Sequence, residues 1–311
     1  MTSRREFCLG TVALLAAWTG CKPSSAPKSQ GKLFVISFLT LDNPFFVELN
    51  RTLKAFIESK GDRLVTLDAQ FNSLKQKNDV VDLLQQGPAV VFINPVNWEA
   101  IKATLVEVKR KNVPVIIVDA PVSDRDLVMC QVASDNFEAG QLAGKALARV
   151  KPAGKVVVLQ HSVNKPSIDR VAGFKSAMVD YPGMVLLDTQ EGSGSTDGSR
   201  LAMQGLLQRY PALDSVFAIN DPSALGAISA IEAAGRMEQV TVVSVDGSRQ
   251  GAAAIVAGKL YASIAQDPRE IARLAAERAY MHLAGQPVEQ DVKVPVRLIT
   301  KENVAELPGA W

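Results

Sequence analysis

The sequence has little of the residues that build disulfides, metal centres and nucleophilic active sites. It has three cysteines, Cys8, Cys21 and Cys130, and two histidines, His161 and His282. No Cys/His spacing typical of a metal site is present, and no serine or cysteine lies in a nucleophile motif. The composition therefore predicts no metal, no cofactor and no enzymatic activity.

The chain also lacks an excess of charge of one sign and has few aromatic residues. Its 34 Lys and Arg against 32 Asp and Glu give a formal net charge of +2, without the basic footprint that nucleic-acid binding needs. Hydrophobic residues make up 47% and aromatic residues only 6%, which is typical of an aliphatic α/β core. A chain of 311 residues is long enough for two domains.

The apolar run near the N-terminus is too short to span a membrane. It covers about a dozen residues, from Cys8 to Trp18, and a helix rising ~1.5 Å per residue over that length falls short of the ~30 Å hydrocarbon core. The adjacent cations Arg4 and Arg5 precede the run, and Cys21 follows it closely. This is the layout of an export signal.

Within this signal, two short patterns resemble known export motifs. Ser3-Arg4-Arg5-Glu6-Phe7 resembles the twin-arginine signal, and Gly20-Cys21 resembles the lipoprotein box, although Trp18 stands where that box usually has an aliphatic residue. The resemblance implies that residues 1–21 are an export signal and that Cys21 carries a lipid. Residues 22–32, rich in Pro, Ser, Gly and Lys, are expected to form a flexible tether.

From residue 33 onward, short β-branched runs alternate with amphipathic segments. The continuously apolar runs predict strands that are buried on both faces, and apolar residues spaced by threes and fours, as from Phe45 to Ile57, predict helices. This alternation predicts an α/β fold with two doubly wound parallel-sheet lobes. The predicted strands are Leu33–Leu39, Ala89–Ile93, Val115–Val118, Lys155–Leu159, Val216–Ile219 and Val240–Val245.

Four of the apolar runs end on a short polar side chain, namely Asn94, Asp119, Asn220 and Asp246. The carboxyl ends of parallel strands are where open α/β sheets bind ligands. Amide and carboxylate groups that meet there can exchange hydrogen bonds with the hydroxyl groups of a sugar or polyol. Alternatively, each residue only caps the next helix or forms a turn. Their presence at all four strand ends favours a binding site.

Seven motifs, in order and at matching spacing, resemble the ribose-type periplasmic sugar-binding proteins from Lys32 to about Lys301. The resemblance implies a type I solute-binding fold, whose two lobes close over a ligand and are joined by crossings near Ser134, Asp267 and Pro295. The N-terminal lobe would comprise residues 33–133 and 267–294, and the C-terminal lobe residues 134–266 and 295–311. The motifs are Asp42-Asn43-Pro44-Phe45-Phe46, Ile93-Asn94-Pro95, Ala133-Ser134-Asp135-Asn136, Arg170-Val171-Ala172-Gly173-Phe174, Ala218-Ile219-Asn220-Asp221, Val245-Asp246-Gly247 and Ile264-Ala265-Gln266.

The same resemblance implies a set of ligand contacts from both lobes. One phenylalanine ring of the pair Phe45 and Phe46 is expected to lie against the C–H face of a sugar, and the other to enter the core. The fork of donors on Arg170 suits two neighbouring hydroxyls or a carboxylate. The implied contacts are Asn43, Phe45, Phe46, Asn94 and Asp119 from the N-terminal lobe, Arg170, Asn220 and Asp246 from the C-terminal lobe, and Gln266 at a crossing.

Three positions depart from the ribose-binding pattern. Ala120 replaces an arginine, Gly194 replaces an aromatic residue, and Leu39 replaces a small hydroxyl residue. These changes predict a roomier pocket and a ligand other than ribose. Trp98 and His161, which follow predicted strands, are further candidates for ligand contact because they could refill part of this space.

The sequence thus predicts an extracytoplasmic receptor. It would capture a sugar or related polyol by hinge closure and deliver it to an ABC transporter permease, with membrane contact only through the lipid anchor. It would lie in the periplasm or at the outer face of the cytoplasmic membrane. One alternative is a sensory protein that presents its ligand to a membrane receptor or kinase. A remote alternative is the effector-binding part of the lac repressor family, but an export signal stands where a DNA-binding helix-turn-helix is expected.

Overall fold

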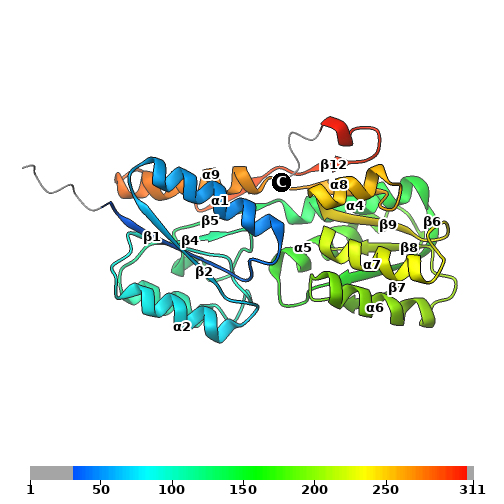
Figure 1. Cartoon of the computed structure of the whole chain (residues 1–311), viewed down its shortest axis with the longest axis horizontal. Helices are drawn as coiled ribbons and strands as arrows, with labels where there is room; N and C mark the ends of the chain where they lie inside the picture. The colour runs from blue at the N-terminus through cyan, green and yellow to red at the C-terminus, as the bar shows by residue number, and fades with distance from the viewer. Residues whose placement is uncertain (1–30, 307–311) are drawn as a thin grey trace, which may run out of the picture. The chain divides into compact units, whose positions relative to one another are not determined.

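The computed structural model describes residues 31–306, which form two α/β lobes, each built on one sheet (Figure 1). The prediction of two parallel-sheet α/β lobes is confirmed. The strands of the first sheet are β1 (Leu33–Phe38), β2 (Arg63–Asp68), β3 (Val90–Ile93), β4 (Val115–Val118), β5 (Cys130–Ser134) and β11 (Asp291–Val294). Those of the second sheet are β6 (Ala153–Gln160), β7 (Gly183–Glu191), β8 (Ser215–Ala218), β9 (Thr241–Asp246), β10 (Ala262–Ala265) and β12 (Arg297–Ile299).

The strand order in both sheets is that of a doubly wound fold. The first sheet runs β11-β5-β4-β3-β1-β2, with every pair parallel. The second runs β12-β10-β9-β8-β6-β7, and only β12 is antiparallel to its neighbour. In each sheet, the second and third strands of the chain pair with opposite sides of the first strand, which creates a crevice at the carboxyl ends.

Helices cover both faces of each sheet. The first sheet packs against α1 (Pro44–Ser59), α2 (Ser73–Leu84), α3 (Lys102–Arg110) and α9 (Pro268–Leu283). The second sheet packs against α4 (Asn136–Val150), α5 (Lys165–Met178), α6 (Thr196–Arg209), α7 (Asp221–Ala233) and α8 (Arg249–Val256). Helices α1 and α9 are far apart in the sequence but lie side by side, blue and orange in Figure 1. Two 3-10 turns, Arg125–Leu127 and Val304–Glu306, complete the described elements. No helix within residues 31–306 combines the length and the apolar character needed to cross a bilayer.

Strand β1 shows why the predicted strands are continuously apolar. Phe34, Ile36 and Phe38 pack on the side covered by α1 and α9, whereas Leu33 and Val35 pack on the side covered by α2 and α3. Successive side chains of a strand point to opposite faces, so a strand with helices on both faces is apolar at most positions; the exception in β1, Ser37, accepts a hydrogen bond from Gln76 Nε2 over 3.2 Å. The two cores of this sheet hold β1 rigidly, and with it the loop that follows.

The chain passes between the two sheets at three places. These are the connections from β5 to α4, from β10 to α9, and from β11 to β12 through Pro295. We propose the lobe boundaries at these connections, near Ser134, Asp267 and Pro295. Gln266, directly after β10, then belongs to a connection and can contact groups from both lobes.

Most of the predicted N-terminal features lie outside the described residues. This holds for the export signal of residues 1–21, with Arg4, Arg5 and Cys21, and for the tether up to residue 30. Lys32, at the end of the expected tether, already joins the folded lobe. Its N–H donates to Asp62 Oδ1 over 2.7 Å, and its carbonyl accepts from the Arg63 N–H over 2.9 Å.

Candidate ligand-binding site

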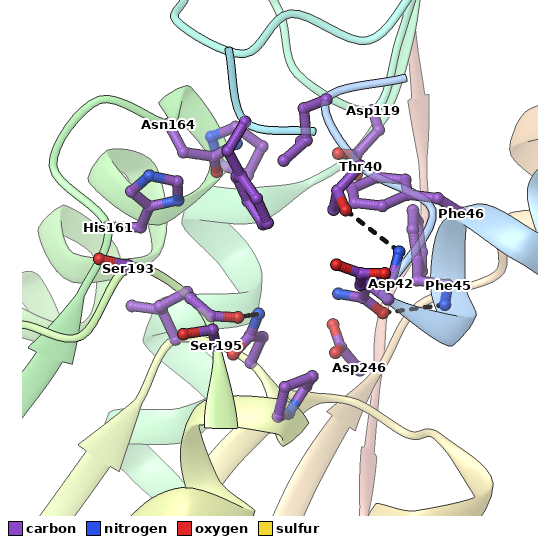
Figure 2. Close-up of a pocket in the computed structure, with 18 of the residues that line it drawn as sticks. Thr40, Asp42, Phe45, Phe46, Asp119, His161, Asn164, Ser193, Ser195 and Asp246 are labelled. Atoms are coloured by element: carbon purple, nitrogen blue, oxygen red, sulfur yellow. Dashed lines mark hydrogen bonds between the residues drawn. The ribbon is translucent and has the colours of Figure 1, made fainter. Parts of the chain in front are cut away.

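A cavity of about 280 Å³ is lined by residues that follow the carboxyl ends of strands in both sheets. Phe71 follows β2 and Asp119 follows β4 in the first sheet, while His161 follows β6 and Asp246 ends β9 in the second. Figure 2 shows the labelled side chains of both lobes around one open space. The cavity therefore lies where doubly wound sheets bind ligands.

The structure brings most of the predicted contact residues to this cavity. The exceptions are Asn94 and Trp98, which are not among the lining residues. Those that line it are Asn43, Phe45, Phe46, Asp119, Arg170, Asn220, Asp246, Gln266 and His161. Their direct contact with a ligand stays a prediction.

Asn94 lies behind the cavity wall instead. Its side chain is fully buried, and its Oδ1 accepts from the Leu39 N–H over 3.3 Å. Its Nδ2 donates to the Val118 carbonyl over 3.3 Å and to Asp119 Oδ2 over 3.1 Å. Asn94 thus joins two segments of the wall and fixes the Asp119 carboxylate in place.

Replacing Asn94 with alanine should destabilise the protein, although the residue does not face the cavity. The Leu39 N–H and one oxygen of Asp119 lose their buried partner, and such losses cost about 1–3 kcal/mol. Urea unfolding would measure the change. Asn78→Ala, on the exposed side of α2, is the comparison. An Asn94 variant as stable as the Asn78 variant would contradict the assigned role.

The capping alternative is correct for some of the polar residues but does not remove them from the cavity. Asn43 caps α1 by accepting from the Phe45 N–H over 2.9 Å. Asn220 caps α7 by accepting from the Ser223 N–H over 2.9 Å, and its Nδ2 donates to the Gly194 carbonyl over 2.9 Å. Both side chains line the cavity as well, so each one combines the two roles.

Asp119 and Asp246 leave their strands with unusual backbone angles. Their φ values are +64° and +139°, in regions that glycine adopts more easily than other residues. Neither residue is the N-cap of a helix in the described chain. A backbone cost of about 1–3 kcal/mol at such positions is typical of sites where side-chain placement matters. The two carboxylates therefore fit a binding role better than a turn role.

Arg170 is the only cation among the residues that line the cavity, and it is 4% exposed. Its Nε donates to Asn136 Oδ1 and its Nη1 to the Ile219 carbonyl, both over 2.8 Å. Nη1 also lies 3.8 Å from Asp246 Oδ1. These contacts hold the guanidinium still, and its Nη2 makes no hydrogen bond within residues 31–306. Nη2 is therefore available to a ligand oxygen.

Asp246 belongs to a buried carboxylate pair with Asp221. Its Oδ1 accepts from Gln266 Nε2 over 2.8 Å, and its Oδ2 accepts from the Asp221 N–H over 3.2 Å. The Asp221 carboxylate accepts from the hydroxyls of Ser244, Ser248 and Ser263 and from the Ser248 N–H. Burial and the neighbouring Asp221 raise the pKa of Asp246 to about 8, against the pull of Arg170. Burial likewise raises the pKa of Asp119 to about 6.

These pKa values predict how the stability of the unliganded protein depends on pH. Between the ordinary aspartate value of about 3.9 and about 8, folded Asp246 holds more proton than unfolded Asp246. Stability therefore falls as pH rises. His161, whose pKa is lowered by burial, opposes this trend only below about 6.5, the ordinary histidine value. We expect the melting temperature of the wild type to fall from pH 6.5 to 8, and we expect a smaller fall for Asp246→Asn. If the melting temperature of the variant falls as steeply as that of the wild type, Asp246 is not the group that causes the pH dependence.

Gln266 has an unsatisfied group at the cavity. Its side chain is 7% exposed and lines the cavity, and its Oε1 is buried without a hydrogen-bond partner. Its Nε2 is already bonded to Asp246. An unpaired buried acceptor is costly, so a ligand that donates a hydrogen bond to Oε1 removes that cost.

The apolar side of the cavity is formed by aromatic rings. Phe45 and Phe46 lie edge to face, with ring centroids 5.3 Å apart, and both belong to the core under α1 as well as to the cavity wall. The expectation that only one of them enters the core was wrong, because a position at the first turn of α1 borders both spaces. Phe71, which the sequence did not indicate, adds a third ring from the loop after β2 and is 44% exposed.

Residues of the two lobes also contact each other at the cavity and beside it. The rings of Phe71 and His161 lie edge to face at 6.3 Å. The Trp98 N–H donates to the Val163 carbonyl over 3.4 Å, and Lys165 Nζ lies 5.8 Å from the centre of the Trp98 ring. Trp98 is thus placed against the opposite lobe rather than in the cavity.

Two of the three residues that depart from the ribose-binding pattern line the cavity, and the third does not. Leu39 and Gly194 line the cavity, and Ala120 is 1% exposed and does not. Gly194 has a φ of +62°, and a Cβ there would lie 3.5 Å from both Asn220 Nδ2 and His161 Nδ1. There is room for a side chain at this position, but the backbone conformation favours glycine.

Within residues 31–306 no group of His, Cys, Asp and Glu is arranged to hold a metal ion.

The comparison with known families agrees with this geometry. A family model described as a periplasmic binding protein domain matches residues 34–287. The chain belongs to the periplasmic binding protein family. It is 32% identical to the ribose import binding protein of Bacillus subtilis, over 90% of this chain and 91% of the relative. It is 33% identical to the ribose import binding protein of Escherichia coli, over 94% of this chain and 98% of the relative.

A solved structure shows the same fold. An ABC transporter solute binding protein from Mycobacterium smegmatis, with bound glycerol, is 31% identical to this binding protein. The two superpose with a TM-score of 0.85, over 90% of this chain and 97% of the other. The relatives named here are binding proteins of importers rather than enzymes, in agreement with the sequence-based expectation.

Proposed function

We propose that this binding protein captures a sugar or a related polyol outside the cytoplasmic membrane and delivers it to the permease of an ABC transporter. The observation that carries the proposal is a cavity whose polar groups come from both lobes and face an aromatic wall. The two ribose import binding proteins and the glycerol-bound ABC transporter solute binding protein named above support the same ligand class and the same partner.

The open hydrogen-bonding positions fit a polyhydroxylated ligand. Arg170 Nη2 can donate, and Gln266 Oε1 can only accept. Asp119 uses one oxygen toward Asn94, so its other oxygen can accept a hydroxyl. The apolar faces of Phe45 and Phe46 suit the C–H face of a ring. Such a ligand would both donate and accept while placing one face on an aromatic ring, as sugars do.

Capture would proceed by hinge closure. A ligand bonded to Asp119 in one lobe and to Arg170 or Asp246 in the other makes all its contacts only when the lobes are together. It therefore stabilises the closed state by its greater affinity for that state. Because Leu39 and Ala120 replace polar groups of the ribose-binding pattern, we expect a ligand that differs from ribose.

A thermal-shift screen tests the proposal. Pentoses, hexoses, polyols and nucleosides are added singly at millimolar concentration, and a ligand of the native state raises the melting temperature. We expect at least one carbohydrate or polyol to raise it, with binding confirmed by titration calorimetry. No shift with any sugar or polyol, together with a clear shift from a nucleoside alone, would reject the proposed ligand class.

We also propose that the protein is exported by the twin-arginine route and anchored by a lipid on Cys21. The arginine pair and the Gly20-Cys21 sequence support this. Changing both Arg4 and Arg5 to lysine should keep the precursor in the cytoplasm, and Cys21→Ser should move the exported protein from the membrane fraction to the soluble fraction. Immunoblots of cell fractions measure both effects. Normal export of the lysine variant would reject the route, and a wild-type protein that is already soluble would reject the anchor.

A further inference from the structure

The charges at the cavity are unbalanced. The lining residues include four carboxylates and one guanidinium, and no lysine. Asp119 and Asp246 are 4% and 2% exposed, and Asp221, directly behind Asp246, is fully buried. The lining carboxylates are Asp42, Asp119, Asp197 and Asp246, and the guanidinium is Arg170.

The buried carboxylates of Asp221 and Asp246 have more polar partners than that of Asp119. Asp221 accepts hydrogen bonds from serine hydroxyls and a backbone N–H. Asp246 lies 3.8 Å from the Arg170 guanidinium and accepts from Gln266. Asp119 accepts only from the Asn94 side chain and has no ion pair among the described residues. Among the buried carboxylates, Asp119 therefore has the fewest polar partners within the described residues, since only the charge of Arg170 adds to its contact with Asn94, and it lines the cavity.

We propose that the ligand is an aminated sugar or aminated polyol, whose protonated amine binds the Asp119 carboxylate. This inference rests on the proposed function and narrows its ligand class. An ammonium supplies the positive charge that the cavity lacks and donates a charge-assisted hydrogen bond to the free oxygen of Asp119. The remaining hydroxyls meet Arg170, Gln266 and Asn220, which line the same cavity.

A neutral sugar would leave the imbalance in place. Hydroxyl groups can hydrogen-bond to carboxylates but add no charge, so buried carboxylates stay costly to ionise. Burial raises the pKa of Asp119 to about 6, and burial together with Asp221 raises that of Asp246 to about 8, so Arg170, the single cation of the cavity lining, does not offset these effects. A bound metal ion is a poor substitute, because the carboxylates of residues 31–306 are not grouped to coordinate one.

The test compares sugars that differ in one group. Calorimetric titrations at pH 7 use D-glucosamine, D-glucose and N-acetyl-D-glucosamine, and the corresponding galactose set, with the melting temperature as a second measurement. We expect an amine to bind about ten- to hundredfold more tightly than its hydroxyl counterpart, as a charged hydrogen bond allows. Acetylation removes the positive charge and should abolish the advantage.

Two variants test whether Asp119 causes the preference for the amine over the neutral sugar. Asp119→Asn should bring the affinity ratio of amine to neutral sugar to about one, because the amide carries no charge. Asp82→Asn, on the exposed side of α2 and outside the cavity lining, removes the same charge elsewhere and should leave the ratio unchanged. An amine preference that survives in Asp119→Asn would overturn the proposal.

The outcomes separate this inference from the proposed function. If a neutral sugar binds as tightly as its amine, the ligand class is wrong but the sugar receptor stands. If no member of either set and no sugar or polyol of the thermal-shift screen binds, the proposed function fails and this inference fails with it.

Discussion

Arg170→Met should lower the free energy of unfolding by about 3–5 kcal/mol at pH 7.5, the usual cost of removing one partner of a buried ion pair. Arg170 is the only cation at a cavity that also contains buried Asp119 and Asp246. Its loss leaves the Asp119 charge uncompensated, makes Asp246 still harder to ionise, and deprives Asn136 Oδ1 and the Ile219 carbonyl of their donor. Ligand affinity should fall below detection, because the same guanidinium offers Nη2 to the ligand.

The pH dependence of the destabilisation and a surface variant test whether the loss of charge is its cause. At pH 5 the carboxylates take up protons more easily, so the destabilisation by Arg170→Met should be smaller than at pH 7.5. Arg110→Met removes an exposed ion pair with Glu107, which is worth about 0–1 kcal/mol. Urea unfolding of both variants at both pH values gives the comparison. A loss for Arg170→Met that is independent of pH would show that packing, not charge, explains its effect.

Asp246→Asn should change stability and binding in opposite directions. At pH 8 the variant avoids the cost of ionising a buried carboxyl beside Asp221, so we expect it to unfold at a higher temperature than the wild type. Affinity for the ligand should fall about ten- to hundredfold, because a charged hydrogen-bond partner contributes about 1.5–3 kcal/mol. Thermal unfolding and titration calorimetry measure the two effects.

The neighbouring carboxylate provides the matched control. Asp221 does not line the cavity and accepts hydrogen bonds from three serines at both of its oxygens. Asp221→Asn replaces one acceptor oxygen by a donor and should destabilise the protein. If Asp246→Asn were equally destabilised and its affinity unchanged, Asp246 would be a structural residue rather than a binding residue.

The sequence predicted six of the eight strands that lie inside the two described sheets, β1, β3, β4, β6, β8 and β9, and missed β5 and β10. Strands β1, β3, β4, β8 and β9 have neighbours on both sides and helices on both faces, so their side chains are buried and mostly apolar, with Ser37, Ser215 and Ser244 among the buried exceptions. Edge strands gave weaker signals, since β2 and β7 are only partly buried along most of their length. Strands β11 and β12 are short and follow the last long helix, so their pairing with different sheets depends on contacts distant in the sequence.

The site was predictable in its location but not in the direction of each side chain. Four strand ends indicated the correct edge of the sheets, yet a sequence pattern does not give the backbone angle at which a strand ends. Asp119 and Asp246 turn at positive φ and reach the cavity, whereas Asn94 has no such turn and stays behind the wall. Phe71 directly precedes Asn72, the N-cap of α2, where an apolar residue usually packs on its own helix.

The Trp98–Val163 hydrogen bond and the contact of Phe71 with His161 have a kinetic consequence. Both join the two lobes, and opening must break them whichever molecule the cavity holds. They therefore slow the dissociation of every ligand by a similar factor, while the cavity decides which ligand is held. The residence time of the cargo is thus set partly by contacts between the lobes, and the Trp98–Val163 backbone hydrogen bond lies outside the cavity lining. A transporter that separates these two contacts would hasten release without competing for the binding groups.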